Sequence, residues 1–335
     1  MLLTFFHLFT KKLRLGNPWR YKIPLLIGLT YFFLLVGNLN STVAFFSFLA
    51  AVCTAVGFAG IGYLTNDLSD KSKDLLAGKD NIVGDLSAVF VGLLGLLFVA
   101  LALGPWFYLP LDYISIILII TEITLFIIYA FPPFRLKEKG ILGLVADALY
   151  AHVIPAILAS WTFFLVGGKQ YEYMIPFLIS LSAWQLVCGI RNILSHQLKD
   201  YENDIKSNMT TYIVKRGVDG MENKMNRIFI PLEITLFLVF ILFIHIEVTY
   251  MLPVLFIYWV IALNRFPKTV EDKSQPLSKH RTNILDKFYI QWLPFIIITG
   301  GIFIDMEVRY IILGHILLFM KFPYKILRKI KDKIG

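Results

Sequence analysis

Long apolar runs separated by short polar segments make up most of the chain. A helix needs about 17 to 25 apolar residues to cross a bilayer. On this criterion the sequence predicts nine membrane-spanning helices, at approximately 23–36, 42–64, 86–103, 111–130, 142–166, 173–190, 228–246, 248–263 and 288–304. The runs lack the alternating pattern of a membrane barrel strand, so the predicted fold is an all-α, polytopic membrane bundle.

The composition agrees with a membrane protein. Hydrophobic residues make up 57% of the chain, above the 45 to 50% that is usual in soluble domains. The net charge of +9 would also suit a nucleic-acid binder. Basic residues, however, lie in the gaps between apolar runs, and no nucleic-acid-binding motif accompanies them. Cys53 and Cys188 both fall inside apolar runs, which argues against a disulfide framework or a thiolate metal site.

The distribution of Lys and Arg predicts the orientation. With the N-terminus inside, the basic residues concentrate in the inner segments, and the outer loops between spans hold only Lys169. We therefore expect a multi-pass protein whose acidic loops are cytoplasmic, in the inner cell membrane if the source is bacterial. Residues 1–22 would form an interfacial N-terminus and residues 23–304 one membrane domain. Residues 305–335 would hold a short apolar segment and a basic tail, with 310–322 either a tenth span or an interfacial helix.

Two acidic segments lie at the inner ends of predicted spans. Segments 66–74 (NDLSDKSKD) and 196–204 (HQLKDYEND) align with Asp70 on Asp200 and Asp74 on Asp204. Carboxylates spaced i, i+4 share one helix face and repel each other unless a cation lies between them. Mg2+ is normally held by one or two carboxylates together with waters and substrate phosphate oxygens. Two such faces turned toward each other predict a magnesium-dependent clamp for a diphosphate.

Further side chains are candidates for the same chemistry. Five basic residues lie in or near the acidic segments, where they either stabilise a departing diphosphate or anchor the chain by the positive-inside rule: Lys71, Lys73, Arg135, Lys137 and Arg191. Two aromatic residues, Tyr129 and Trp184, are candidates to face an allylic cation. Polar residues inside the spans should face the bundle interior, and these are Glu122, Asp147, His152 and Gln185.

The acidic pattern resembles the UbiA superfamily of intramembrane prenyltransferases. The resemblance rests on Asn-Asp-x-x-Asp-x-x-x-Asp at the end of the second span, on segment 129–140 (YAFPPFRLKEKG), and on Asp200-x-x-x-Asp204 followed by Thr210, Thr211 and Gly217. Segment 129–140 looks like the family's Tyr-Ser-x-x-x-Arg-x-Lys stretch. Two positions depart from the pattern, because Ala130 replaces the usual Ser and His196 stands where many members have an acid.

The resemblance implies a helical bundle around a central cavity that cytoplasmic loops cap, with Mg2+ holding the diphosphate of an isoprenoid donor. One metal would be carried by Asn66, Asp67, Asp70 and Asp74, and a second by Asp200 and Asp204. Neutral imidazole is a poor ligand for a hard, oxygen-preferring ion. We therefore expect His196 to meet the diphosphate or the acceptor.

The resulting hypothesis is Mg2+-dependent transfer of an isoprenyl group from its diphosphate to an unidentified, lipophilic or aromatic acceptor, a reaction of terpenoid biosynthesis. The catalytic candidates are Asp67, Asp70, Tyr129, Asp147 and His196, and the substrate-binding candidates are Lys71, Lys73, Arg135, Lys137, Arg191 and Trp184. Two enzymes with the same metal cradle are alternatives, a UbiA-type terpene cyclase and a phosphosugar transferase acting on polyprenyl phosphate. A cation-coupled transporter is the non-enzyme alternative, although transporters place such sites nearer the bilayer midplane.

Overall fold

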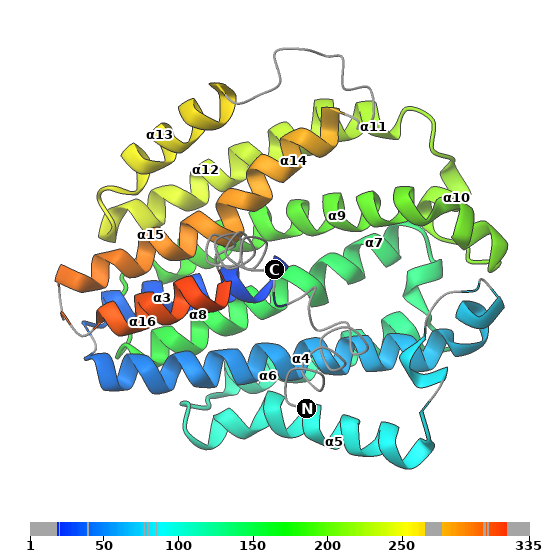
Figure 1. Cartoon of the computed structure of the whole chain (residues 1–335), viewed down its shortest axis with the longest axis horizontal. Coiled ribbons are helices and arrows are strands. Elements are labelled where there is room, and N and C mark those ends of the chain that lie inside the picture. The colour runs from blue at the N-terminus through cyan, green and yellow to red at the C-terminus, as the bar shows by residue number, and fades with distance from the viewer. Residues whose placement is uncertain are drawn as a thin grey trace, which may run out of the picture.

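The protein is an all-α bundle in the residues that its computed structural model describes, which are 19, 21–38, 40–76, 78, 81–84, 86–264, 277–303, 306 and 308–319. The long helices run side by side, with α5 at one edge of the bundle and α13 at the other (Figure 1). The principal helices are α3 (Ile23–Val36), α4 (Ser41–Leu76), α5 (Ala88–Leu103), α6 (Tyr113–Ala130), α7 (Ile141–Ala148), α8 (Ile154–Val166), α9 (Met174–Lys206), α10 (Tyr212–Arg216), α11 (Met221–Lys224), α12 (Ile230–Glu247), α13 (Met251–Asn264), α14 (Leu277–Lys287), α15 (Leu293–Gly300) and α16 (Val308–Phe319).

The all-α prediction is confirmed, and each of the predicted apolar runs falls on helix. Within the described ranges, six helical stretches are long and apolar enough to cross a bilayer: Ser41–Leu76, Ala88–Phe107, Tyr113–Ala130, Ile141–Val166, Met174–Lys206 and Met221–Glu247. The runs at 23–36, 248–263 and 288–304 form shorter helices, so the count of nine spans stays a prediction. Predictions for residues 1–18 and for the basic tail at 320–335 lie outside the described residues.

The segment predicted as either a tenth span or an interfacial helix forms α16. This helix has 12 residues, a length of about 18 Å at 1.5 Å per residue, well short of the hydrocarbon thickness. It packs on the bundle, because His315 is fully buried and its Nδ1 lies 3.2 Å from the Tyr31 hydroxyl of α3. Trp19 Nε1 also donates a hydrogen bond to the Leu318 carbonyl at 3.1 Å.

Small residues allow α4 and α5 to approach closely. A Cβ atom on Gly57 would lie 2.2 Å from the backbone nitrogen of Ala102, and one on Gly60 would lie 2.3 Å from Cδ1 of Phe98. Glycine is therefore required at both positions of this helix pair, as is common where membrane helices cross closely. Close packing against α5 therefore holds the apolar half of α4 in place on one side.

Three π-helical turns interrupt the described helices, at Leu149–Val153, Met225–Phe229 and Phe288–Trp292. Each turn directly precedes a helix whose second residue is proline, namely Pro155, Pro231 and Pro294. Proline lacks an N–H and its ring clashes with the carbonyl four residues earlier, so a wider turn relieves the clash without ending the helix. The first of these turns carries Tyr150 and His152 into the bundle interior.

The two acidic segments lie on the extensions of the two longest helices. α4 and α9 both continue past their apolar runs, and their polar ends reach the same end of the bundle, beside α10 and the start of α7 (Figure 1). Neither glycine nor proline interrupts 66–76 or 196–206, so nothing in these segments stops the helix. The i, i+4 spacing inferred for the carboxylates is therefore real helical spacing in both segments.

Candidate active site

The first acidic segment presents buried carboxylates at the end of α4. Asp67 is 2% exposed and Asp70 is 7% exposed, although both lie in a polar stretch. Asp74 faces a different partner, since Asn81 Nδ2 donates to its Oδ2 at 2.8 Å and to the Asp67 carbonyl at 2.9 Å. Lys71 is exposed. The segment thus turns Asp67 and Asp70 inward and leaves Lys71 at the surface.

The loop between α6 and α7 supplies two cations to Asp70. Arg135 Nη2 lies 2.7 Å from Asp70 Oδ1, and Lys137 Nζ lies 2.6 Å from Oδ2. Lys137 also donates to Ser69 Oγ at 2.8 Å and to Asn66 Oδ1 at 3.0 Å. Burial lowers the pKa of Lys137 from its usual value, and the neighbouring Asp70 carboxylate only partly offsets that effect. Both oxygens of Asp70 are therefore held by cations.

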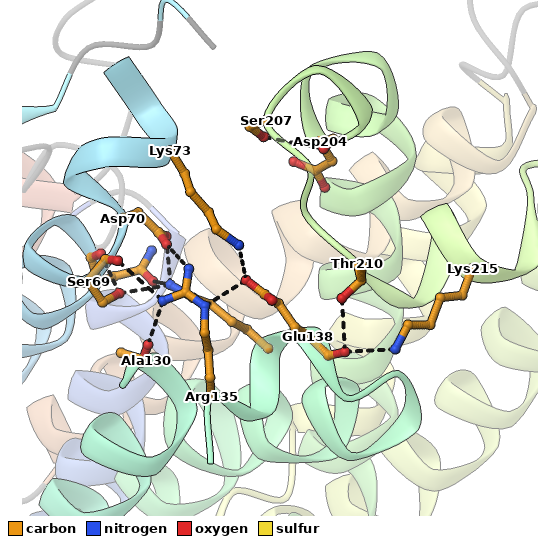
Figure 2. Close-up of polar contacts among 12 residues, drawn as sticks. Ser69, Asp70, Lys73, Ala130, Arg135, Glu138, Asp204, Ser207, Thr210 and Lys215 are labelled. Carbon is orange, nitrogen blue, oxygen red and sulfur yellow. Dashed lines mark hydrogen bonds and ion pairs between the residues drawn. The ribbon is translucent and has the colours of Figure 1, made fainter. Parts of the chain in front are cut away.

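Arg135 reaches Asp70 through an unusual backbone conformation. Its φ of 41° and ψ of 57° place it in the left-handed region, which costs a non-glycine residue about 1 kcal/mol or more. Hydrogen bonds of the guanidinium offset part of this cost. Nη1 donates to the carbonyls of Ser69 at 3.2 Å and Ala130 at 3.1 Å. The family-like loop is thus folded back onto the end of α4, as Figure 2 shows.

Glu138 connects this loop to the end of α4 and to the residues around the start of α10. Its Oε1 accepts from Lys73 Nζ and Arg135 Nε, both at 2.6 Å. Its carbonyl oxygen accepts from Thr210 Oγ1 at 3.4 Å and Lys215 Nζ at 2.9 Å (Figure 2). Burial raises the pKa of the Glu138 carboxyl, but Lys73 and Arg135 outweigh burial and hold the pKa below its usual value. Sequence reasoning missed this residue, whose only signal is its place between two lysines of the Arg-x-Lys segment.

The second segment is arranged around Asp204. This carboxylate is 6% exposed, and Thr211 Oγ1 donates to its Oδ2 at 3.4 Å. Asp200 is half-buried and His196 is exposed, one and two turns earlier on α9. Figure 2 shows Asp204 above Glu138, on the side of the cluster opposite the Ala130 carbonyl. The α6–α7 loop therefore contacts the end of α4 on one side and the residues that follow the second acidic segment on the other.

Two predicted substrate-binding residues lie elsewhere. The guanidinium of Arg191 is buried and paired with Glu233, with Nε to Oε2 at 2.5 Å, and with Asp286, with Nη2 to Oδ1 at 2.7 Å. Trp184 is fully buried, with its ring centroid 4.9 Å from that of Phe237 and 5.0 Å from that of Phe240. Both residues contribute to packing between α9 and α12, and neither contacts the acidic cluster in the described residues.

The remaining candidates lie deeper in the bundle. Tyr150 Oη donates to Asp147 Oδ1 at 2.6 Å. The rings of Tyr129 and Tyr150 meet edge to face with centroids 4.9 Å apart. Asn192 Nδ2 lies 3.4 Å from His152 Nε2. Tyr150 thus contacts both Asp147 and Tyr129, and the catalytic roles of these two residues stay a prediction.

The oxygen donors of the acidic segments suit a hard cation. Carboxylate and amide oxygens are the ligands that Mg2+ prefers. No three His, Cys, Asp or Glu side chains among the described residues are close enough to hold a metal by themselves. A bound ion would therefore complete its shell with waters and substrate oxygens, which is the usual coordination of Mg2+ beside a phosphate.

The fold and the cluster together define an all-helical membrane protein with a carboxylate- and cation-rich site at one end of the bundle. Solved structures share this fold. A UbiA homolog from Archaeoglobus fulgidus bound to GPP and Mg2+ matches with a TM-score of 0.51 and 19% identity, over 86% of this chain and 99% of that one. The same homolog bound to DMAPP and Mg2+ matches with a TM-score of 0.51 and 18% identity, over 86% and 99%.

A digeranylgeranylglyceryl phosphate synthase also matches, with a TM-score of 0.50 and 15% identity over 88% of this chain and 97% of that one. No protein-family model matches the chain, and no curated protein matches it. The chain therefore has the UbiA fold, which confirms the resemblance read from its motifs at the level of fold.

Proposed function

We propose that the protein is a Mg2+-dependent prenyltransferase of the UbiA type, which transfers an isoprenyl group from an isoprenyl diphosphate to an acceptor. The observation that carries the proposal is the Asp70 pairing, in which Arg135 and Lys137 each hold one carboxylate oxygen. Cations paired with a carboxylate at a rim are available to a diphosphate, because phosphate oxygens accept the same hydrogen bonds. The solved relatives with this fold hold GPP or DMAPP with Mg2+.

Different residues of the chain would bind the metal and the diphosphate. Asp67 and Asp204 would offer oxygens to Mg2+, and Asp70 and Asn66 would do so once Arg135 and Lys137 turn from them to the diphosphate. Asp74 and Asp200 lie at the edges of the same two segments. Arg135, Lys137 and Lys73 offer N–H donors to the diphosphate. The bound metal would neutralise charge on the leaving diphosphate. This negative charge grows as the allylic C–O bond breaks. Hydrogen-bond donors that already surround the diphosphate therefore lower the activation barrier for breaking the bond.

Apolar helices enclose this site, and the closed interior would protect the allylic cation from water. The bilayer would supply the lipophilic donor. Since α4 and α9 both carry their acidic segments to one end of the bundle, the reaction would take place at one membrane surface. We infer that this surface is cytoplasmic, from the distribution of Lys and Arg along the chain.

Thermal unfolding with and without chelator tests the proposal. A ligand that binds only the folded state raises the melting temperature in proportion to its occupancy. We expect GPP to raise it in the presence of Mg2+ or Mn2+ and to have no effect in the presence of EDTA. Equal stabilisation under both conditions would contradict a bridging metal. Loss of the shift in Asp67→Asn, with the shift retained in the exposed-site control Asp219→Asn, would locate the metal at the acidic cluster.

A further inference from the structure

Glu138 is the only acidic residue of the α6–α7 loop, which spans 131–140. Its Oε1 accepts from Lys73 Nζ and from Arg135 Nε, each at 2.6 Å. One carboxylate oxygen is therefore shared by two of the three cations in this cluster (Figure 2). The Glu138 side chain is 19% exposed and that of Lys73 is 28% exposed, so water partly screens these ion pairs and leaves them open to exchange.

The backbone of Glu138 is anchored separately from its carboxylate. Its amide nitrogen donates to the Arg135 carbonyl at 3.1 Å, and its carbonyl accepts from Lys215 Nζ at 2.9 Å and from Thr210 Oγ1 at 3.4 Å. None of these three hydrogen bonds involves the carboxylate. Rotation about the side-chain bonds can therefore move the carboxylate to another partner while the loop keeps its position between α4 and α10.

The three cations of the cluster differ in how far they depend on Glu138. Lys137 directs its ammonium to three acceptors of α4, which matches the three N–H donors of a lysine. In the described part of the chain, the hydrogen bond of Lys73 goes to Glu138 alone. Arg135 uses Nη1 and Nη2 for other acceptors, and its Nε contacts Glu138. Because Lys73 Nζ and Arg135 Nε bind the same oxygen atom, they are close enough together to bind neighbouring oxygens of one diphosphate.

A diphosphate and a carboxylate compete for the same donors. Both anions accept charge-assisted hydrogen bonds from ammonium and guanidinium groups. The diphosphate carries more negative charge and offers more oxygens, so it is the stronger partner while it is bound. When it leaves, Lys73 Nζ and Arg135 Nε would lie side by side without an anion between them. The Glu138 carboxylate removes that repulsion by pairing with both, and its pairing therefore favours the state without diphosphate.

We propose that Glu138 is a positioning residue that exchanges with the diphosphate on Lys73 and Arg135; this inference rests on the proposed prenyl transfer. In the free protein the carboxylate holds both cations. When a donor binds, diphosphate oxygens replace the carboxylate. After transfer the carboxylate binds both cations again and the diphosphate product leaves. No covalent bond changes in this exchange. Glu138 therefore limits the affinity of the site for diphosphate and speeds the release of the product.

The test measures binding of inorganic diphosphate, the product, so it does not require the acceptor. The full-length protein in lipid nanodiscs is titrated with diphosphate and Mg2+ by calorimetry. Glu138→Gln keeps the size of the side chain and an oxygen acceptor but removes the charge. We expect the Kd for diphosphate to fall about tenfold, the equivalent of about 1.4 kcal/mol. Release of radiolabelled diphosphate after dilution should slow by a similar factor, since changes in affinity at one site lie mostly in the dissociation rate.

Three further variants make the result specific. Glu138→Asp keeps the charge but withdraws it by one methylene group, so the Kd should fall about threefold, less than in Glu138→Gln. Lys73→Met removes one of the two cations and should raise the Kd. In that background Glu138→Gln should have a smaller effect, because the two residues interact directly. Asp219→Asn removes an exposed carboxylate from the turn between α10 and α11, and its Kd should equal that of the wild type.

The outcomes separate this inference from a purely structural role and from the proposed function. If Glu138 only maintained the shape of the loop, Glu138→Gln would weaken the binding of diphosphate. Weaker or unchanged binding in Glu138→Gln, at a wild-type melting temperature, would therefore overturn the inference. If Glu138→Gln does not fold, the direction of the change in Glu138→Asp decides. A wild type that binds neither diphosphate nor a non-ionisable thiol analogue of GPP with Mg2+ would refute the proposed function, and this inference with it.

Discussion

Arg135 and Arg191 were predicted for the same role, and the structure places them in contrasting environments. Arg135 lies on the α6–α7 loop with a side chain that is 15% exposed, and it shares Asp70 and Glu138 with two lysines. Arg191 lies inside α9 with a side chain that is 2% exposed, and Glu233 and Asp286 neutralise it. One arginine belongs to a cluster at the end of α4 in which its own side chain remains partly exposed. The other belongs to a closed ion triad between helices.

The difference shows how to separate a functional cation from a structural one. Breaking a buried ion pair leaves an uncompensated charge, so the triad holds α9, α12 and α14 in one arrangement. Partly exposed ion pairs, such as that of Lys73 with Glu138, are weaker, because water screens them and competes for the same hydrogen bonds. Such pairs can exchange partners. The cluster around Asp70 is therefore suited to receive a diphosphate, and the triad is suited to maintain the bundle.

The largest expected effect is on stability, at the triad. Glu233→Gln should lower the free energy of unfolding by about 3 to 5 kcal/mol, because Arg191 is left without its fully buried partner. Thermal unfolding in detergent measures this change. The double variant Arg191→Met, Glu233→Leu should recover most of the loss, since Asp286 is partly exposed and can be hydrated. A double variant no more stable than Glu233→Gln would show that the charges themselves are needed.

The second effect is on turnover, at the acidic cluster. Asp70→Asn should reduce kcat about 100- to 1,000-fold, or roughly 2.7 to 4 kcal/mol, because it removes a charge that positions the metal and the leaving group. Its melting temperature should fall less than that of Glu233→Gln. Transfer assays and unfolding curves on the same preparations check both statements. Asp219→Asn, an exposed carboxylate, is the control and should behave as wild type. Near-normal kcat in Asp70→Asn would remove Asp70 from the site.

The third effect sharpens the role of Arg135. Arg135→Lys keeps the charge but loses the planar fork that holds Asp70 and Glu138 together, and we expect KM for the donor to rise about tenfold, or 1.4 kcal/mol. Arg309→Lys, on α16, changes an exposed arginine in the same way and should leave KM unchanged. A loss of stability in Arg135→Lys comparable with that of Glu233→Gln would place Arg135 with the structural triad.

The smallest effect is the pH dependence of the loop. The pKa of Glu138 is lowered in the folded state, so its contribution to stability is complete above the unfolded pKa, near 4.5, and is lost as the pH falls through the folded pKa. We expect the melting temperature of the wild type to fall below that range more steeply than that of Glu138→Gln. Parallel curves for the two proteins would show that the bonds to Lys73 and Arg135 add no pH-dependent stability.

Much of the architecture is legible in the chain itself. Apolar runs long enough to require helix in a bilayer mark the bundle, because lipid leaves backbone groups no other partner. Carboxylates at i, i+4 spacing in two such helices mark the acidic cluster, since helical periodicity alone puts them on one face. The sequence predicted that Arg135 and Lys137 bind the diphosphate, but not that they pair with Asp70, because nothing in the local pattern shows which residues the loop folds onto.

Only the tertiary structure separated residues with the same sequence signal. Arg191 and Arg135 both follow the positive-inside pattern, and the difference lies in Glu233 and Asp286, which approach Arg191 from distant helices. Glu138 links two distant parts of the chain, because its carboxylate pairs with Lys73 on α4 and its carbonyl accepts hydrogen bonds from Thr210 and Lys215 at the start of α10. Helical periodicity specifies which face of the helix a side chain occupies. Which residue of another helix it contacts there depends on helix packing, and therefore on long-range contacts that no local sequence pattern encodes.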